Sequence, residues 1–194
     1  RIFLECAWEA LESAGYNPET YPGLVGLYAG AALNTYLLYN LASTPGAAAA
    51  FAASYPSAYD TLFGNDKDFL TTRVAHKLNL RGPCMTVQTA CSTGLVAVVQ
   101  AYYSLLTYQC DMALAGGISI TFPQRRDYRY QRDGMVSRDG TCRTFDAQAS
   151  GTVFDGNSIA GTDLRGIGGW DKTGVAGIDD GTGGVADNGK IPDQ

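Results

Sequence analysis

The sequence contains almost no histidine, since His76 is the only one in 194 residues. Histidine is the usual general base beside a nucleophilic serine or cysteine. A hydrolase triad would need a histidine later in the chain, and none follows His76. His76 itself lies next to the apolar face of a predicted helix, where a packed or surface histidine is the expected role. The near absence of histidine therefore argues against a hydrolase triad with a cysteine nucleophile.

Other features that would indicate a class of protein are also missing. No apolar run reaches the roughly 18 residues needed to cross a membrane, and no signal-peptide pattern is present. The formal charge of −5 argues against nucleic acid as the partner. The five cysteines are odd in number, and none is in Cys-x-x-Cys spacing. We therefore expect a cytoplasmic protein without a membrane segment, zinc site, disulfide framework or bound cofactor.

The sequence has enough hydrophobic residues to form a core, since they make up 45% of the chain. Apolar periodicity predicts helices over residues 1–14, 65–78 and 92–108, and strands over 24–30, 84–90 and 111–115. Residues 33–59 are predicted to form a long excursion with short helical pieces. Strand, helix and strand at this length form a right-handed βαβ unit. The fold class is therefore α/β, with a parallel sheet and helices on its faces.

Cys91 stands at the turn between the last predicted buried strand and the long helix. The first amides of that helix point toward the thiol, and the positive end of the helix dipole favours the thiolate. Such placement lowers the pKa of a cysteine and favours nucleophilic catalysis. The alternative is a cysteine that packs as a small hydrophobic residue. The spacing alone leaves both interpretations open.

Two later stretches differ in composition from the rest. Residues 124–143 hold six arginines, with three aspartates among them; a salt-bridged surface is favoured there over a phosphate-binding patch. Residues 151–194 hold half of the 24 glycines without a clear period, which is typical of a flexible or poorly packed segment. The run Asp180–Gly184 lacks the Gly-Lys-Ser/Thr ending of a phosphate-binding loop.

The segment Val87–Leu95, with the letters VQTACSTGL, resembles the active-site segment of β-ketoacyl synthases. It resembles in particular the ketosynthase domains of modular polyketide synthases and hybrid peptide–polyketide synthases. Further stretches in the same order as in that family are residues 4–12, 64–70, 73–83, 111–117 and 142–146. The resemblance divides the chain into residues 1–154, a partial ketosynthase N-terminal region, and residues 155–194, a glycine-rich tail that departs from the family.

The resemblance implies a thiolase-like fold, layered α-β-α-β-α and built from two similar halves, of which this chain holds mainly the N-terminal one. It implies an acyltransferase that performs decarboxylative Claisen condensation. Cys91 would accept an acyl chain as a thioester, with its amide as one oxyanion-hole donor. The substrates would be carried on the phosphopantetheine of an acyl carrier protein. The implied partners are that carrier protein, the other polyketide synthase domains, and a second copy that pairs along about residues 86–90.

The same family uses two histidines after the nucleophile, in a His-Gly-Thr-Gly-Thr and an Asn-Ile-Gly-His segment, to promote decarboxylation. This chain has neither, so by itself we expect it not to condense. The family's second half and about its first fifty residues are also missing, and the tail is interpreted as an out-of-frame or aberrant continuation. A non-catalytic, truncated thiolase-like module for dimerisation or carrier-protein contact is therefore kept as the alternative.

Overall fold

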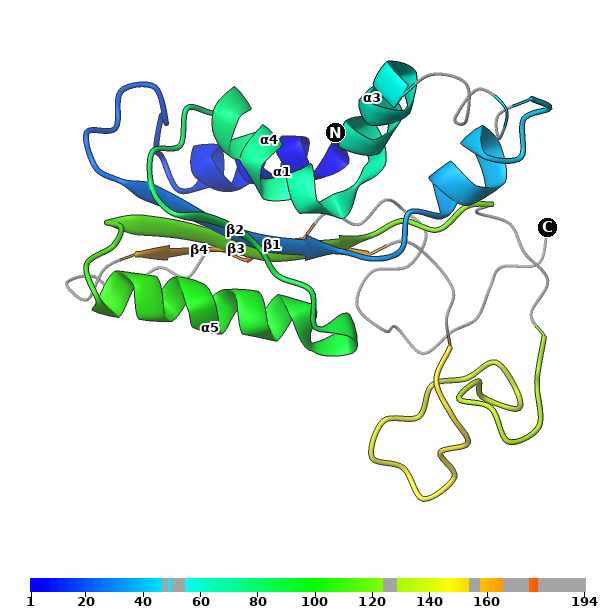
Figure 1. The fold of residues 1–194 in the computed structure, drawn as a ribbon. Coiled ribbons are helices and arrows are strands. Elements are labelled where there is room, and N and C mark those ends of the chain that lie inside the picture. Colours follow the sequence, from blue (N-terminus) through cyan, green and yellow to red (C-terminus); the bar gives the residue numbers. More distant parts are fainter. Residues whose placement is uncertain (47–48, 50–54, 124–128, 154–157, 166–174, 178–194) are drawn as a thin grey trace.

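Helices cover both faces of one central sheet in the computed structural model (Figure 1). The structure describes residues 1–46, 49, 55–123, 129–153, 158–165 and 175–177. Helices α1 (Ile2–Ser13) and α4 (Leu70–Lys77) lie on one face, and α5 (Thr93–Leu106) lies on the other. This arrangement of helix, sheet and helix confirms the predicted α/β class.

The sheet has the strand order β2-β1-β3-β4-β5. Strands β1 (Val25–Ala31), β2 (Cys84–Thr86) and β3 (Met112–Ser119) are parallel to one another. Strands β4 (Ser158–Arg165) and β5 (Val175–Gly177) continue the sheet with antiparallel pairing. The crossover from β2 through α5 to β3, with β1 between the two strands, is the predicted βαβ unit.

The two late strands lie in the glycine-rich stretch, where the sequence pattern predicted no strand. β4 pairs with β3 over its full length, and glycine lies opposite glycine at Gly116 and Gly161. Pairing along the free edge of β3 depends on backbone hydrogen bonds rather than on a side-chain period. A search for periodicity could therefore not find these strands.

The predicted helices agree with the structure to within a few residues. The helix expected over 65–78 begins as a 3₁₀ turn at Lys67–Phe69 and continues as α4. Asp66 caps it, because its side chain accepts a hydrogen bond of 3.1 Å from the Asp68 amide. In the predicted excursion, a π-helical turn at Leu37–Leu41 and helix α3 (Tyr55–Asn65) are the described helical pieces.

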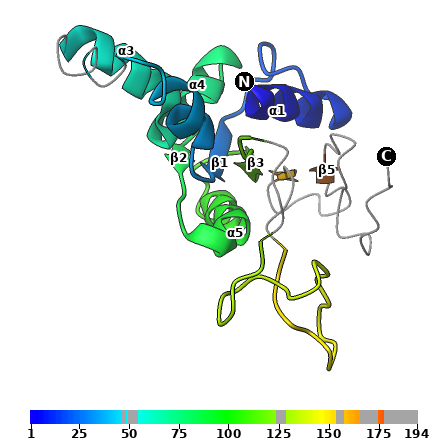
Figure 2. The same ribbon diagram turned by 90° about the vertical axis from the view of Figure 1, so that its right-hand side faces the viewer.

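The sheet separates two hydrophobic cores. The second view shows α1 and α4 on one side of the sheet and α5 on the other (Figure 2). Alternation along the strands decides which residue enters which core. Leu27 of β1 and Leu114 of β3 pack under α1 and α4, whereas Tyr28 and Ala115 pack against α5. The side of α5 that meets the sheet is formed by small residues, Ala97 and Ala101, which lets the helix approach closely.

The strand before Cys91 is shorter and more exposed than the sequence predicted. A buried strand was expected over residues 84–90, but β2 ends at Thr86 and none of its three residues is buried. The correction has a simple cause: β2 is the edge strand of the sheet, and the chain leaves the ladder after Thr86 to begin the turn. The candidate nucleophile therefore lies at a sheet edge.

Candidate active site

Cys91 lies in a single 3₁₀ turn, Ala90–Ser92, that leads directly into α5. Its side chain is exposed. The preceding residue, Ala90, has φ of +53°, in the left-handed region that non-glycine residues seldom adopt. The sharp change of direction therefore falls one residue before the thiol and presents Cys91 at the N-terminal end of a 14-residue helix.

Hydrogen bonds within the turn hold this conformation. The Thr89 amide donates to the Thr93 hydroxyl at 2.9 Å, and the Ser92 hydroxyl donates to the Thr89 carbonyl at 2.8 Å. The Thr93 amide donates to the Ala90 carbonyl. Residues on both sides of Cys91 are thus tied to one another, so the thiol sits on a closed loop at the start of the helix.

Gly30 of β1 allows the turn to pack closely against the sheet. A Cβ atom at this position would lie 2.0 Å from the Val87 carbonyl oxygen and 2.4 Å from the Thr93 methyl carbon. No side chain larger than hydrogen fits there unless the turn moves. Gly30 was not among the predicted site residues. The available sequence signal was a glycine near the end of a predicted buried strand. The sequence could not show that this glycine packs against Val87 and Thr93 of the turn.

The five cysteines differ sharply in their surroundings. Burial raises the pKa of the Cys6, Cys84 and Cys110 thiols, which opposes formation of their thiolates. Only Cys91 and Cys142 have exposed side chains, and only Cys91 stands at the start of a long helix. All five are free thiols in the structure. Exposure and helix position together therefore distinguish Cys91 from the other four.

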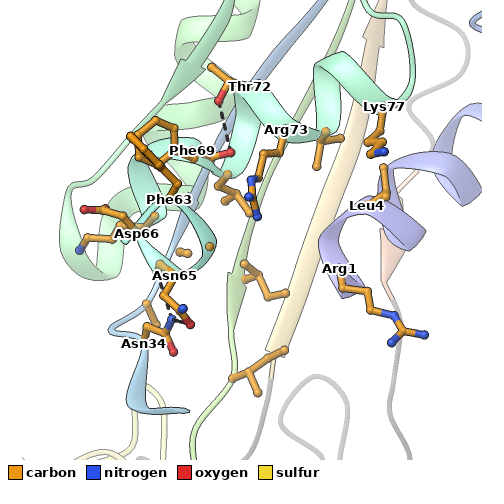
Figure 3. A pocket seen from close by; sticks show the side chains of 18 of the residues that line it. Arg1, Leu4, Asn34, Phe63, Asn65, Asp66, Phe69, Thr72, Arg73 and Lys77 are labelled. Atoms are coloured by element: carbon orange, nitrogen blue, oxygen red, sulfur yellow. Dashed lines mark hydrogen bonds between the residues drawn. The ribbon is translucent and has the colours of Figure 1, made fainter. Parts of the chain in front are cut away.

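The structure does not bring His76 to the turn of Cys91. His76 is exposed on α4 and lines a cavity of about 770 Å³, formed by α1, α4, the α3 end and the strand ends. Arg73, Lys77 and Leu4 also line this cavity (Figure 3). No residue of the segment 86–95 contributes to its wall. The cavity is therefore separate from the candidate nucleophile.

The arginine-rich stretch contains an ion pair, as the salt-bridged interpretation expected. The Arg143 guanidinium lies 2.7 Å from the Asp139 carboxylate. Together with hydrogen bonds from the Ser137 hydroxyl and the Thr141 amide, it lowers the pKa of Asp139 to about 2. Residues 124–128 of the stretch lie outside the described part of the chain.

Two other kinds of feature are absent from the described residues. No group of three or more histidine, cysteine, aspartate or glutamate side chains among them could hold a metal ion. None of the helices in the same residues is long and apolar enough to cross a membrane. The described site thus consists of Cys91, its turn and the start of α5.

Comparison with known proteins gives a consistent match. Residues 1–160 match the family model described as "Beta-ketoacyl synthase, N-terminal domain". The chain is 49% identical over 156 residues to one component of the phenolphthiocerol/phthiocerol polyketide synthase of Mycobacterium tuberculosis. It is 38% identical over 154 residues to phthioceranic/hydroxyphthioceranic acid synthase of Mycobacterium bovis. These matches cover 79% of this chain but only 10% and 7% of the relatives.

Solved structures agree with the sequence relatives. Ketosynthase twelve of the bacillaene polyketide synthase from Bacillus amyloliquefaciens aligns with a TM-score of 0.66 and 29% identity, over 85% of this chain and 27% of that one. The module 6 ketosynthase of the bacillaene synthase from Bacillus subtilis gives 0.65 and 31%, over 86% and 25%. The chain thus spans about a quarter of these solved ketosynthases.

Proposed function

The chain belongs to the β-ketoacyl synthase family, and from this premise we propose that it carries the acyl-accepting cysteine of a polyketide ketosynthase. The fold is the N-terminal half of a thiolase-like domain. One observation carries the proposal: Cys91 is the cysteine that is both exposed and placed at the N-terminal end of α5. That position offers the first amides of α5 to a developing oxyanion.

In the proposed first step, the Cys91 thiolate attacks the carbonyl carbon of an acyl thioester on the phosphopantetheine of an acyl carrier protein. A new bond forms from Sγ to that carbon, and the carbon–sulfur bond to the carrier breaks. The released phosphopantetheine thiolate takes up the proton that Cys91 has lost. The Cys91 amide supplies one hydrogen bond to the oxyanion of the tetrahedral intermediate.

In the second step, a malonyl-type extender on a carrier protein loses carbon dioxide, and the resulting carbanion attacks the acyl carbon on Cys91. A carbon–carbon bond forms, and the Cys91 thiolate leaves. No histidine follows His76 in this sequence. The groups that promote decarboxylation must therefore come from a part of the enzyme outside these residues, so we expect this chain alone to be acylated but not to condense.

The proposed partners are an acyl carrier protein, further polyketide synthase domains and a second copy of the chain. The edge position of β2 supports the homodimer, because an edge strand presents unpaired backbone groups to another strand. Phosphopantetheine would arrive with the carrier protein, and we propose no cofactor of the chain's own. The proposed location is the cytoplasm.

We place the boundary of the ketosynthase portion at about residue 154 and treat residues 155–194 as a tail that departs from the family. The family model ends at residue 160, close to this boundary. Sequencing the coding DNA through the junction tests the proposal. A frame shift at the junction is the expected result, and one intact frame in independent clones would contradict it.

The experiment for the proposed function is substitution of Cys91→Ala in the full-length synthase. Chain extension should fall by several orders of magnitude, because the acyl thioester has no attachment point. Cys142→Ala is the matched control, since Cys142 is also exposed, and it should leave extension unchanged. Retained chain extension by the Cys91→Ala enzyme would contradict the role.

A non-catalytic thiolase-like module is the second candidate, and the missing histidines favour it. The two functions differ in what the full-length protein does with an acyl thioester. A ketosynthase acylates Cys91 and then extends the chain when malonyl carrier protein is added. A binding module forms its contacts with the carrier protein without turnover, and Cys91→Ala leaves its affinity for the carrier protein unchanged.

A further inference from the structure

The end of β1 presents backbone groups that β2 does not pair. Hydrogen bonds from β1 toward β2 use every second residue: the Leu27 amide donates to the Pro83 carbonyl at 2.8 Å, and the Ala29 carbonyl accepts from the Val87 amide at 2.9 Å. The next residue in this alternation is Ala31. By that point β2 has ended, and the chain has turned toward Cys91.

The side chain of Gln88 takes the place of the missing strand. The Gln88 carboxamide faces both backbone groups of Ala31, and we assign its orientation from these two partners: the nitrogen then donates to the Ala31 carbonyl at 3.0 Å, and the oxygen accepts from the Ala31 amide at 3.1 Å. Both backbone groups of Ala31 are thereby paired by one carboxamide. A main-chain residue of β2 could pair the Ala31 amide and carbonyl only if β2 continued past Thr86. A longer β2 would move Cys91 away from the start of α5.

From this geometry we propose that Gln88 is a positioning residue for Cys91. The Gln88 carboxamide hydrogen-bonds to the end of β1 at the point where the main chain turns away from the sheet. Only Thr89 and Ala90 separate Gln88 from Cys91 in the sequence. The close packing of Val87 on Gly30 fixes the other side of the same turn. The inference rests on the proposed role of Cys91, and it adds a residue that sets where the thiol stands without touching the substrate.

Three substitutions separate the hydrogen bonds from the bulk of the side chain. Gln88→Met keeps the length and removes both hydrogen bonds. Gln88→Glu keeps the acceptor for the Ala31 amide but loses the donor to the Ala31 carbonyl. Gln100→Met is the matched control, because Gln100 is exposed on α5, away from the β1 end.

The readout is single-turnover acylation of Cys91 in the full-length synthase, measured by mass spectrometry over a range of concentrations of hexanoyl N-acetylcysteamine thioester. We expect Gln88→Met to lower the acylation rate constant at saturation by about tenfold, and Gln88→Glu by about threefold. The half-saturating concentration should change by less than about twofold, because Gln88 does not contact the thioester. Gln100→Met should match the unsubstituted enzyme.

A rate constant within twofold of the unsubstituted enzyme in Gln88→Met would overturn the inference, and so would equal losses in Gln88→Met and Gln88→Glu. If the unsubstituted enzyme is not acylated at Cys91, the proposed function fails, and positioning is then decided by iodoacetamide labelling. In that case a threefold or larger change in the Cys91-to-Cys142 labelling ratio on Gln88→Met supports the inference, and any smaller change overturns it. If Gln88→Met does not fold, Gln88→Glu replaces it: a rate constant within twofold of the unsubstituted enzyme then overturns the inference, as does a labelling ratio that changes by less than threefold where labelling is the readout.

Discussion

Close packing of a few atoms determines where Cys91, the proposed nucleophile, stands in this molecule. The turn before Cys91 has one residue in the left-handed region, Ala90, and lies in contact with a glycine of the neighbouring strand. Such a conformation persists only where neighbouring contacts hold it. Gly30 and the hydrogen-bonded Thr89 and Thr93 supply those contacts. The residues around Cys91 thus determine the position of the proposed nucleophile.

Gly30→Ala tests this packing directly. The added methyl group would overlap the Val87 carbonyl oxygen, so the turn must move, and we expect the free energy of unfolding to fall by about 1–3 kcal/mol. Acylation of Cys91 should slow together with it. Gly64→Ala in α3 is the control, because a Cβ built on Gly64 meets no neighbouring group within 4 Å. Unchanged stability and acylation in Gly30→Ala, measured by chemical denaturation and mass spectrometry, would contradict the account.

Asp139 gives a pH-dependent prediction at the same scale. Its pKa in the folded chain is about 2, below the ordinary 3.8. The stabilising contribution of this carboxylate is therefore present above pH 3.8 and is lost as the pH falls through about 2. The Thr141 amide, which donates to Asp139 at 3.2 Å, reports the change in an NMR titration.

The Thr141 amide shift should move with a midpoint near pH 2, which is the folded pKa of Asp139. Asp139→Asn is the control, since it keeps an oxygen acceptor that does not titrate in this range, and it should remove the transition. A midpoint at the ordinary value of 3.8 in the unsubstituted chain would show that the ion pair with Arg143 does not form in solution.

Among the elements, α5 connects the candidate nucleophile to the core. It packs its small residues against β1 and β3, and inside this contact lies a buried polar cluster. The Ser104 hydroxyl hydrogen-bonds to the Tyr28 side chain and lies 3.3 Å from the Cys110 sulfur. Burial raises the pKa of Tyr28, which keeps its hydroxyl neutral. The cluster fixes how α5 sits on the sheet.

Ser104→Ala should therefore lower the free energy of unfolding by about 1–3 kcal/mol, because it leaves the buried Tyr28 hydroxyl without this partner. Tyr28→Phe combined with Ser104→Ala should cost less than the sum of the two single substitutions, since no polar group is then left unpaired. Urea denaturation of the four proteins provides the measurement. Full additivity would mean that the hydrogen bond does not couple α5 to β1.

At this scale the sequence predicted much of the fold. The positions of α1, α4, α5, β1 and β3 follow from apolar periodicity, which records the faces that each element buries. Two features could not be predicted in this way. β2 ends early at the sheet edge, where the Gln88 side chain pairs with Ala31, and β4 forms by backbone pairing in a glycine-rich stretch. Both depend on contacts between distant residues.

The candidate site also contains residues that the local sequence indicates and residues whose role depends on contacts with distant parts of the chain. The position of Cys91 before a long helix could be predicted from the local sequence, and its catalytic role stays a prediction from that position and the family motif. Gly30 could not be assigned to the site from the sequence, because it lies more than fifty residues away and its role depends on register between β1 and the turn. Nor could the local sequence show that Gln88 bonds backward to β1.

In the whole molecule, the outer side of α5 is unusually apolar. Leu95, Val99, Tyr102 and Tyr103 form one stripe at helical spacing, and all four are exposed. A thiolase-like fold has two similar halves, and the chain spans about a quarter of the solved ketosynthases that it matches. We expect the second half of the domain to cover this stripe in the full-length enzyme.

Val99→Lys tests this expectation. In the full-length synthase the charge would be buried without a partner, so the melting temperature of the ketosynthase domain should fall by several degrees. Gln100→Lys, one residue further along the same helix, is the control and should have little effect. Equal melting temperatures for Val99→Lys and the unsubstituted synthase would show that the stripe stays exposed.

The central claim is that Cys91 accepts the acyl chain, and peptide mapping after reaction with an acyl thioester tests it most directly. The full-length synthase is incubated with hexanoyl N-acetylcysteamine thioester, digested at low pH, and every cysteine-containing peptide is analysed for added hexanoyl mass. We predict that the label lies on the peptide containing Cys91, is absent from the peptide containing Cys142, and is removed by hydroxylamine. Label on Cys142 with Cys91 unmodified would contradict the account.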